Sequence, residues 1–210
     1  WEKGPDWLKD GVIYQVYPSS YKDSDGNGIG DIRGVISKLD YIESLGVRAI
    51  WFNPLFVSGW IDGGYDVIDF YRVDPRFGTN NDLVELIEKA HARGIKVMLD
   101  LVAGHTSDKH PWFLQSAQDT NLQYSDYYIW SDRLPDEKAE RDLETMLKDP
   151  NYMQNTLGKW MKSEYPRNRY YYKNFYACQP ALNYGYANPD PAHPWEQGVN
   201  DPGPKAVRQE

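Results

Sequence analysis

Hydrophobic positions in the first hundred residues alternate between the spacing of strands and the spacing of helices. Residues 12–17 are β-branched and aromatic, which is typical of a strand. Within 32–45 the apolar residues recur every three or four positions, which predicts a helix with one apolar face. The same reasoning predicts a strand at 47–52, a helix at 81–93 and an almost wholly apolar strand, covered on both faces, at 95–102. Because strands alternate with helices, we expect the strands to pair in parallel.

This alternation stops after His105. Up to about residue 188 the chain is rich in Trp, Tyr, Asn, Asp and Pro, with one helical run around 143–161. Structureless loops of that length are uncommon in compact domains, so we interpret the stretch as an inserted subdomain. Prolines then indicate an extended return, and residues 205–210 resemble the start of a helix. We therefore expect three parts: 1–105 with three barrel-type strands, 106–188 as the inserted subdomain, and 189–210 as the return.

Composition narrows the classes of function. The chain is 40% hydrophobic and 15% aromatic, which excludes an intrinsically disordered protein. The 23 basic and 31 acidic side chains leave a net charge of −8, which argues against a nucleic-acid partner. No apolar run has the length of a membrane span or opens the chain as a signal peptide, and the single cysteine, Cys178, excludes an internal disulfide. The chain begins with Trp rather than Met, and nothing in the sequence indicates a compartment.

A loop of alternating oxygen donors follows the first predicted strand. Residues 23–31 read DSDGNGIGD, with side-chain oxygens at alternate positions and glycines between them. Hard divalent cations take such oxygen ligands. The spacing matches an EF-hand loop up to its ninth position, but the twelfth position, normally Glu, is Gly34, and a strand precedes the loop. We predict a structural metal site rather than a calcium sensor; the alternative is a polar turn without metal.

Polar residues also follow the second and third predicted strands. Residues 58–66 read SGWIDGGYD, and residues 100–105 read DLVAGH. Taken alone, the first is an ordinary turn and the second ends in a histidine that can be purely structural. In parallel α/β architectures, however, ligands bind at the carboxyl ends of the strands. We therefore interpret the three segments as parts of one ligand-binding edge.

Four segments in this order resemble the α-amylase superfamily, glycoside hydrolase family 13, and within it the α-glucosidase and oligo-1,6-glucosidase branch. They are residues 23–31, 62–66, 100–108 and the QPALN segment at 179–183. The resemblance implies an α/β fold, the N-terminal part of a (β/α)8 TIM barrel with an irregular subdomain inserted after the third strand. It also implies retaining cleavage, or transfer, of α-glucosidic bonds in gluco-oligosaccharides.

The resemblance assigns roles to individual residues. Asp62, Tyr65 and His105 match positions that bind the glucose ring next to the scissile bond, and Phe175 and Gln179 match pocket positions contributed by the inserted subdomain. A structural calcium or magnesium ion is implied at Asp23, Asp25, Asn27, Asp31 and the backbone carbonyl of Ile29. We expect a pocket that closes around a terminal glucose unit and therefore exo action on short oligosaccharides. The alternative is that Tyr65 is core packing and Asp62 a turn residue.

Departures from the family pattern change what we expect. Gly104 stands where the family usually has Asn, so we expect no second calcium between barrel and subdomain, and Ala181 replaces a frequent Asp, which leaves substrate preference open. Retaining glycosidases need two carboxylates, a nucleophile and an acid/base. We expect both beyond residue 210, because no Gly-Phe-Arg-x-Asp segment occurs in the chain. The chain is then the N-terminal part of a longer enzyme, inactive by itself, with the remainder of the barrel as its partner.

Other functions remain compatible with the residues. Glucosyl transfer or isomerisation, as in sucrose isomerases, amylosucrases and trehalose synthases, is the main alternative to hydrolysis. A non-catalytic relative that uses the fold for partner binding is another, although such a protein would not need Asp62, Tyr65 and His105 together. A calcium-responsive module is the weakest alternative, because Gly34 replaces the bidentate Glu.

Overall fold

The computed structural model describes residues 4–210 as two compact units. The first comprises the chain up to Val57 together with Asp69–Leu101, and the second comprises Ser58–Ile68 and Val102–Glu210. All the residues predicted to contact sugar lie in the second unit, and the predicted metal loop lies in the first. The boundaries expected at residues 105 and 188 stay predictions, because compactness does not define membership of a barrel.

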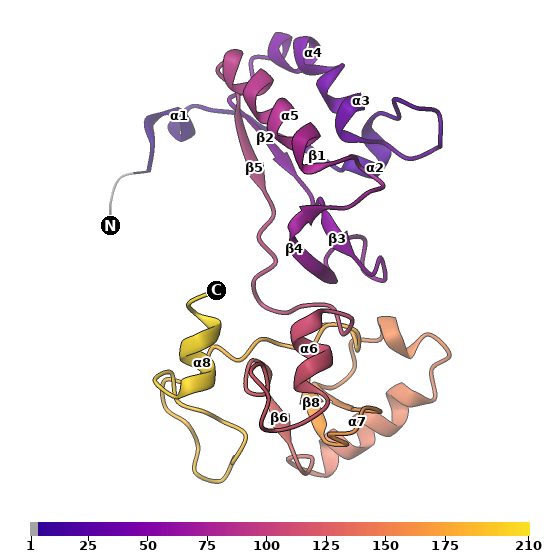
Figure 1. Ribbon diagram of the computed structural model, residues 1–210, viewed down its shortest axis with the longest axis vertical. Coiled ribbons are helices and arrows are strands. Elements are labelled where there is room, and N and C mark those ends of the chain that lie inside the picture. The colour runs from indigo at the N-terminus through magenta and orange to yellow at the C-terminus, as the bar shows by residue number, and fades with distance from the viewer. Residues whose placement is uncertain (1–3) are drawn as a thin grey trace. The chain divides into compact units, whose positions relative to one another are not determined.

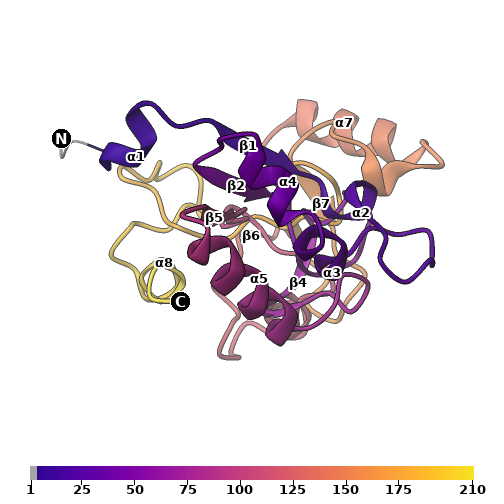
Figure 2. The ribbon, with the colours of Figure 1, turned by 90° about the horizontal axis from the view of Figure 1, so that it is seen from above.

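The first unit is built on a parallel sheet. Its strands β1 (Ile13–Val16), β2 (Ala49–Phe52) and β5 (Lys96–Leu99) pair in the order β1-β2-β5, in the register that sets Tyr14 beside Ile50 and Ile50 beside Val97. Helices α3 (Ile32–Ile36), α4 (Leu39–Ser44) and α5 (Asn80–Ala92) gather on one side of this sheet in both views (Figures 1 and 2). The parallel strands and their helices confirm the predicted α/β pattern. Short helices α1 (Asp6–Lys9) and α2 (Pro18–Tyr21) and a two-stranded sheet of β3 (Phe56–Ser58) and β4 (Val67–Val73) complete the elements up to β5.

Two expectations for this unit were wrong in detail. The helix predicted over 32–45 is interrupted between α3 and α4, where the Ser37 hydroxyl donates to the Gly34 carbonyl at 2.6 Å and competes with helical hydrogen bonding. The strand β5 is not covered on both faces: Met98 is 37% and Leu99 36% exposed. It pairs with β2 on one edge, and no further strand of residues 4–210 pairs with its other edge.

The second unit has its own sheet and core. Strands β6 (Trp130–Ser131), β8 (Tyr170–Tyr172) and β7 (Trp160–Lys162) pair antiparallel in that order. Their aromatic side chains pack with Phe113 of α6 (Pro111–Ser116), whose ring stacks on Trp130 with centroids 5.6 Å apart. The irregular inserted segment thus contains a small aromatic core of its own. The helix α8 (Pro202–Val207) ends the described elements and begins three residues earlier than predicted.

The helix predicted around 143–161 was wrong. Helix α7 spans Glu137–Leu147, a short 3-10 helix follows at Tyr152–Gln154, and β7 begins at Trp160. Asp149 explains the break, because its carboxylate accepts hydrogen bonds from the Asn151 N–H at 2.9 Å and the Asn155 amide at 2.8 Å. These local bonds replace helical ones.

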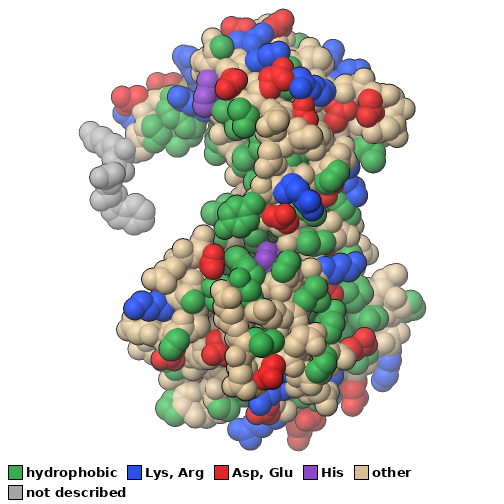
Figure 3. All heavy atoms as spheres, in the orientation of Figure 1, with side chains coloured by type: hydrophobic (Ala, Val, Ile, Leu, Met, Phe, Trp, Pro, Cys, Tyr) green, Lys and Arg blue, Asp and Glu red, His purple; other side chains and the backbone are tan. Residues whose placement is uncertain are grey.

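Charged side chains are spread over the visible surface of the chain (Figure 3). On the face shown in Figure 3, acidic and basic side chains are interspersed and do not form a basic field. No helix within residues 4–210 has the length and apolar character needed to cross a membrane.

Candidate functional site

A buried carboxylate organises the turn that carries the predicted sugar ligands. Asp66 is 0% exposed and accepts hydrogen bonds from the Ser58 hydroxyl at 2.9 Å and from the backbone N–H groups of Ile61 and Asp62, both at 3.1 Å. Gly59 passes so close that a Cβ there would lie 2.4 Å from Asp66 Oδ2. The loop is therefore wrapped around one side chain, which fixes where Asp62 leaves the backbone.

The turn itself needs glycine. The Tyr65 N–H donates to the Asp62 carbonyl at 2.9 Å, and the two residues between them, Gly63 and Gly64, have φ values of 57° and 108°. Only glycine adopts two consecutive positive φ values at low cost. The turn brings Asp62 and Tyr65 out on neighbouring positions of one loop, each partly exposed.

Asp62 is joined to the inserted segment by a charge-assisted hydrogen bond. The Gln179 amide donates to Asp62 Oδ2 at 2.6 Å, although the two residues are 117 positions apart in the chain. Gln179 is 0% exposed, and its Oε1 accepts the Tyr176 N–H at 2.9 Å. Within residues 4–210 the other carboxylate oxygen of Asp62 has no hydrogen-bond partner, so it is the atom available to a ligand hydroxyl.

His105 is buried beside the same turn. The residue pairs with Ala181 in an isolated antiparallel bridge, which draws 104–106 against 180–182. Its Nε2 lies 2.9 Å from the Tyr65 carbonyl, and its ring meets the Phe175 ring edge-on with centroids 5.9 Å apart. Burial lowers the pKa of His105, while the hydrogen bond to the Tyr65 carbonyl and the charges of Asp62 and Asp66 oppose that shift.

The five predicted sugar-binding residues are thus connected. Asp62 contacts Gln179, Tyr65 contacts His105 through its carbonyl, and His105 contacts the ring of Phe175. Phe175 remains 56% exposed, so part of its aromatic ring is accessible beside His105. Aromatic faces cover the C–H surface of sugars, and carboxylates accept hydrogen bonds from hydroxyls. The arrangement has the chemistry of a site for a neutral, hydroxyl-rich ligand.

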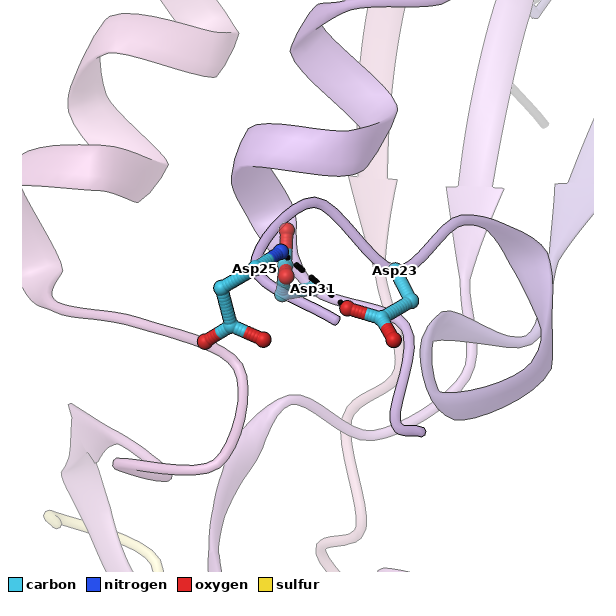
Figure 4. Close-up of side chains that lie close together, drawn as sticks. All are labelled: Asp23, Asp25 and Asp31. Carbon is cyan, nitrogen blue, oxygen red and sulfur yellow. Dashed lines mark hydrogen bonds between the residues drawn. The ribbon is translucent and has the colours of Figure 1, made fainter. Parts of the chain in front are cut away.

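The predicted metal loop gathers three carboxylates in the first unit. Oxygens of Asp23, Asp25 and Asp31 lie within 4.8 Å of one another (Figure 4). Asn27 lies beside them: its Oδ1 accepts the Ile29 N–H at 2.8 Å, and its side-chain amide donates to Asp25 Oδ2 at 3.1 Å. Within residues 4–210 none of the three aspartates forms an ion pair with Lys or Arg, so a cation would offset their mutual repulsion.

Backbone donors already hold this loop in shape. Asp23 accepts N–H groups from Gly26 at 2.7 Å and Gly28 at 2.8 Å, and these bonds lower its pKa. Asp31 caps α3 by accepting the Gly34 N–H at 2.6 Å. A Cβ at Gly34 would lie 1.9 Å from the Lys22 carbonyl oxygen, which explains why the twelfth position cannot carry the EF-hand glutamate. Charged carboxylates at short mutual distance and a preformed backbone are compatible with Ca²⁺ or Mg²⁺.

Sequence reasoning missed two residues of the sugar site. Asp66 was considered only as part of the turn, yet it is the carboxylate around which the loop folds. Asn174 was not singled out, and its side-chain amide lies 3.0 Å from His105 Nδ1. The one sequence signal for Asn174 was Gly104, whose missing side chain leaves the space that this amide approaches. Asp100, directly after β5, accepts the Trp51 indole N–H at 2.6 Å.

The chain is similar to known proteins over most of its length. The family model for the α-amylase catalytic domain matches residues 15–195. An oligo-1,6-glucosidase of Heyndrickxia coagulans is 40% identical over 179 residues, which cover 85% of this chain and 31% of that protein. The crystal structure of Bacillus licheniformis trehalose-6-phosphate hydrolase superposes with a TM-score of 0.72 at 39% identity, over 85% of this chain and 30% of that one.

A third similar protein is named as a synthase rather than a hydrolase. The isomaltulose synthase of Klebsiella sp. LX3 superposes with a TM-score of 0.73 at 39% identity, over 89% of this chain and 32% of that one. The chain therefore spans about a third of the length of the proteins that it matches. The chain belongs to the α-amylase family and carries the N-terminal portion of its (β/α)8 catalytic barrel, with a subdomain inserted after the third barrel strand.

Proposed function

We propose that this chain forms the glucose-binding part of a retaining α-glucosidase that acts on short α-linked oligosaccharides. The observation that carries the proposal is the Asp62–Gln179 hydrogen bond, which orients one carboxylate oxygen and leaves the other available to a ligand. In this proposal Asp62 accepts hydrogen bonds from glucose hydroxyls. Tyr65 and Phe175 cover the C–H face of the ring, and Gln179 holds Asp62 in place.

His105 has a donor role in the proposed site. Its Nε2 lies 2.9 Å from the Tyr65 carbonyl. In the proposed site a glucose hydroxyl is a second acceptor for the same N–H. A carboxylate at the non-reducing end blocks further sugar units, which favours exo action over cleavage within a long chain. The nucleophile and acid/base of the retaining mechanism are assigned to no residue of this chain. Its residues bind and orient the sugar, and catalysis requires two further carboxylates.

Kinetics of the full-length protein with nitrophenyl α-glucoside test this proposal. Tyr65→Ala removes an aromatic face and Asp62→Ala leaves hydroxyls unpaired, and each loss of about 1–3 kcal/mol lowers kcat/KM about ten- to a hundredfold. Melting temperatures of the same variants separate binding from packing. A large fall in melting temperature for Tyr65→Ala with kcat/KM unchanged would show that Tyr65 is core packing. Rapid internal cleavage of long amylose by the parent protein would contradict the closed pocket.

Glucosyl transfer or isomerisation is a second candidate, favoured by the likeness to an isomaltulose synthase. In both reactions a sugar hydroxyl, instead of water, accepts the glucosyl group. The ratio of free glucose to released nitrophenol distinguishes hydrolysis from transfer. Hydrolysis gives equal amounts of the two products, and transfer gives less glucose than nitrophenol. The binding residues proposed above serve both reactions.

We also propose that the loop of Asp23, Asp25 and Asp31 holds one structural calcium or magnesium ion. Support comes from the three convergent carboxylates without a basic partner in the described residues. Asn27 and the Ile29 carbonyl complete the proposed ligand set. The ion would tie the loop to the start of α3, because Asp31 also caps that helix.

A further inference from the structure

The two ring nitrogens of His105 have partners of opposite character. Nε2 lies 2.9 Å from the Tyr65 carbonyl oxygen, which can only accept, so Nε2 carries a proton. Nδ1 lies 3.0 Å from the Asn174 side-chain Nδ2, which can only donate, so Nδ1 presents its lone pair. Together the two contacts select the neutral imidazole with its proton on Nε2 and disfavour the imidazolium, which would place an N–H against the amide.

Gly104 makes this contact sterically possible. A Cβ built on Gly104 would lie 2.9 Å from Asn174 Nδ2, the atom that donates to His105. Real Cβ atoms do not lie that close to another heavy atom unless something shifts, so any side chain at this position displaces the amide. Gly104 is followed directly by His105, and its carbonyl accepts the Leu182 N–H at 3.1 Å, which fixes the backbone next to the ring.

The backbone around Asn174 is held on several sides. The Asn174 N–H donates to the Gln179 carbonyl at 2.9 Å, and the Asn174 carbonyl accepts from the Lys159 ammonium at 2.9 Å. The next carbonyl, that of Phe175, accepts from Lys173 Nζ at 2.9 Å, and Lys173 is 0% exposed. Two lysines thus bind the consecutive backbone carbonyls of Asn174 and Phe175. The side chains of these two residues both contact the His105 imidazole.

We propose that Asn174 is a positioning residue for His105: its amide fixes the imidazole as the neutral Nε2–H tautomer, and Gly104 provides the room. Its kinetic consequence rests on the proposed function. If His105 binds a sugar hydroxyl, the neutral Nε2–H tautomer can only donate a hydrogen bond to that hydroxyl and cannot accept one. The same N–H holds the Tyr65 carbonyl, so the tautomer also determines how firmly the Asp62–Tyr65 turn is fastened.

The test is nitrogen NMR of histidine-labelled full-length protein, with His105 assigned by the resonances that disappear in His105→Gln. We expect Nδ1 of the parent to resonate as an unprotonated ring nitrogen and Nε2 as a protonated one. Asn174→Asp replaces the donor with an anionic acceptor, so Nδ1 gains a proton. The pH at which His105 takes its second proton should rise by about 1–3 units, and the acid limb of kcat/KM should rise with it.

Asp62 and Asp66, whose charges act on His105 in the parent, are kept in every variant, so a change is assigned to the new carboxylate at position 174. Asn151→Asp, on an exposed residue of the same unit, introduces the same charge without touching the ring and should leave the His105 resonances unchanged. Gly104→Ala keeps Asn174 but pushes its amide away. We expect Gly104→Ala to broaden the Nδ1 and Nε2 resonances of His105 and to lower kcat/KM about tenfold. This variant tests the proposal even if an Asn174 variant fails to fold.

An unprotonated Nε2 in the parent, or His105 resonances that are the same in Asn174→Asp, Gly104→Ala and the parent, would overturn the proposal. The nitrogen spectra do not depend on turnover. If the variants change the tautomer but the protein hydrolyses and transfers no α-glucoside, the positioning role stands and the proposed function fails. If turnover is found but the tautomer is insensitive to position 174, the positioning role fails alone.

Discussion

Replacing Gln179 by leucine tests how strongly the two parts of the sugar site are joined. The substitution keeps the volume of a side chain that is 0% exposed and removes both of its hydrogen bonds, the one to Asp62 at 2.6 Å and the one from the Tyr176 N–H at 2.9 Å. Hydrogen bonds to charged groups contribute about 1.5–3 kcal/mol, and an orphaned buried donor costs about 1–3 kcal/mol. Because Asp62 is half-buried and water replaces part of its lost bond, we expect a loss of about 2–4 kcal/mol in the free energy of unfolding.

Urea unfolding of the full-length protein measures this loss, and Gln115→Leu is the matched control. Gln115 also lies in the second unit, but its buried Oε1 accepts no hydrogen bond from the described residues. Leucine there removes an unsatisfied polar atom, so the control should be neutral or slightly stabilising. If the two variants lose the same free energy of unfolding within about 0.5 kcal/mol, the reasoning is refuted, because the side-chain hydrogen bonds of Gln179 would then contribute no measurable stability.

A charged substitution at the same position adds a pH signature. Gln179→Glu keeps an acceptor for the Tyr176 N–H but places a second carboxylate next to Asp62. Two carboxylates at that distance cannot both ionise without cost, so one pKa is raised. The pair shares a proton at low pH, and stability is lost as pH rises through the raised pKa. We expect the variant to approach the stability of the parent near pH 4 and to fall below it near pH 8, with the leucine variant showing no such slope.

Three further measurements address other parts of the chain. Calorimetric titration of the full-length protein with calcium and magnesium should show one site that Asp25→Ala weakens, with no binding heat for either ion in the parent as the contradicting result. The 210-residue chain alone should hydrolyse no nitrophenyl α-glucoside above background, and turnover by it would mean that the catalytic carboxylates lie within it. Burial lowers the pKa of Lys173 to about 8, so the unfolded chain binds more protons between that value and the ordinary pKa of about 10.4. Unfolding stability should therefore rise with pH across this window in the parent but not in Lys173→Met, and equal slopes in the two proteins would refute the assignment.

The sequence by itself determined the features that depend on neighbouring residues. The spacing of apolar positions predicted β1, β2, β5 and α5 within one to three residues at each end, because each element buries one face or strip of its own side chains. The glycines and aspartates at 23–31 and 62–66 predicted their turns, because positive φ values and side-chain-to-backbone hydrogen bonds are properties of a few consecutive residues. The resemblance to the α-amylase family rested on such local segments as well.

Tertiary structure decided what joins distant segments. Gln179 meets Asp62 across 117 positions, and Asn174 meets His105 across 69, and no local pattern encodes either contact. The helix expected around 143–161 failed partly for a local reason, since Asp149 accepts hydrogen bonds from Asn151 and Asn155 just after α7. The pairing of Trp160–Lys162 with β8 is tertiary, and it makes these residues a strand. Periodicity reports which face of a segment is apolar. Which partner that face finds, and which buried polar atoms then face each other, depends on how the whole chain packs.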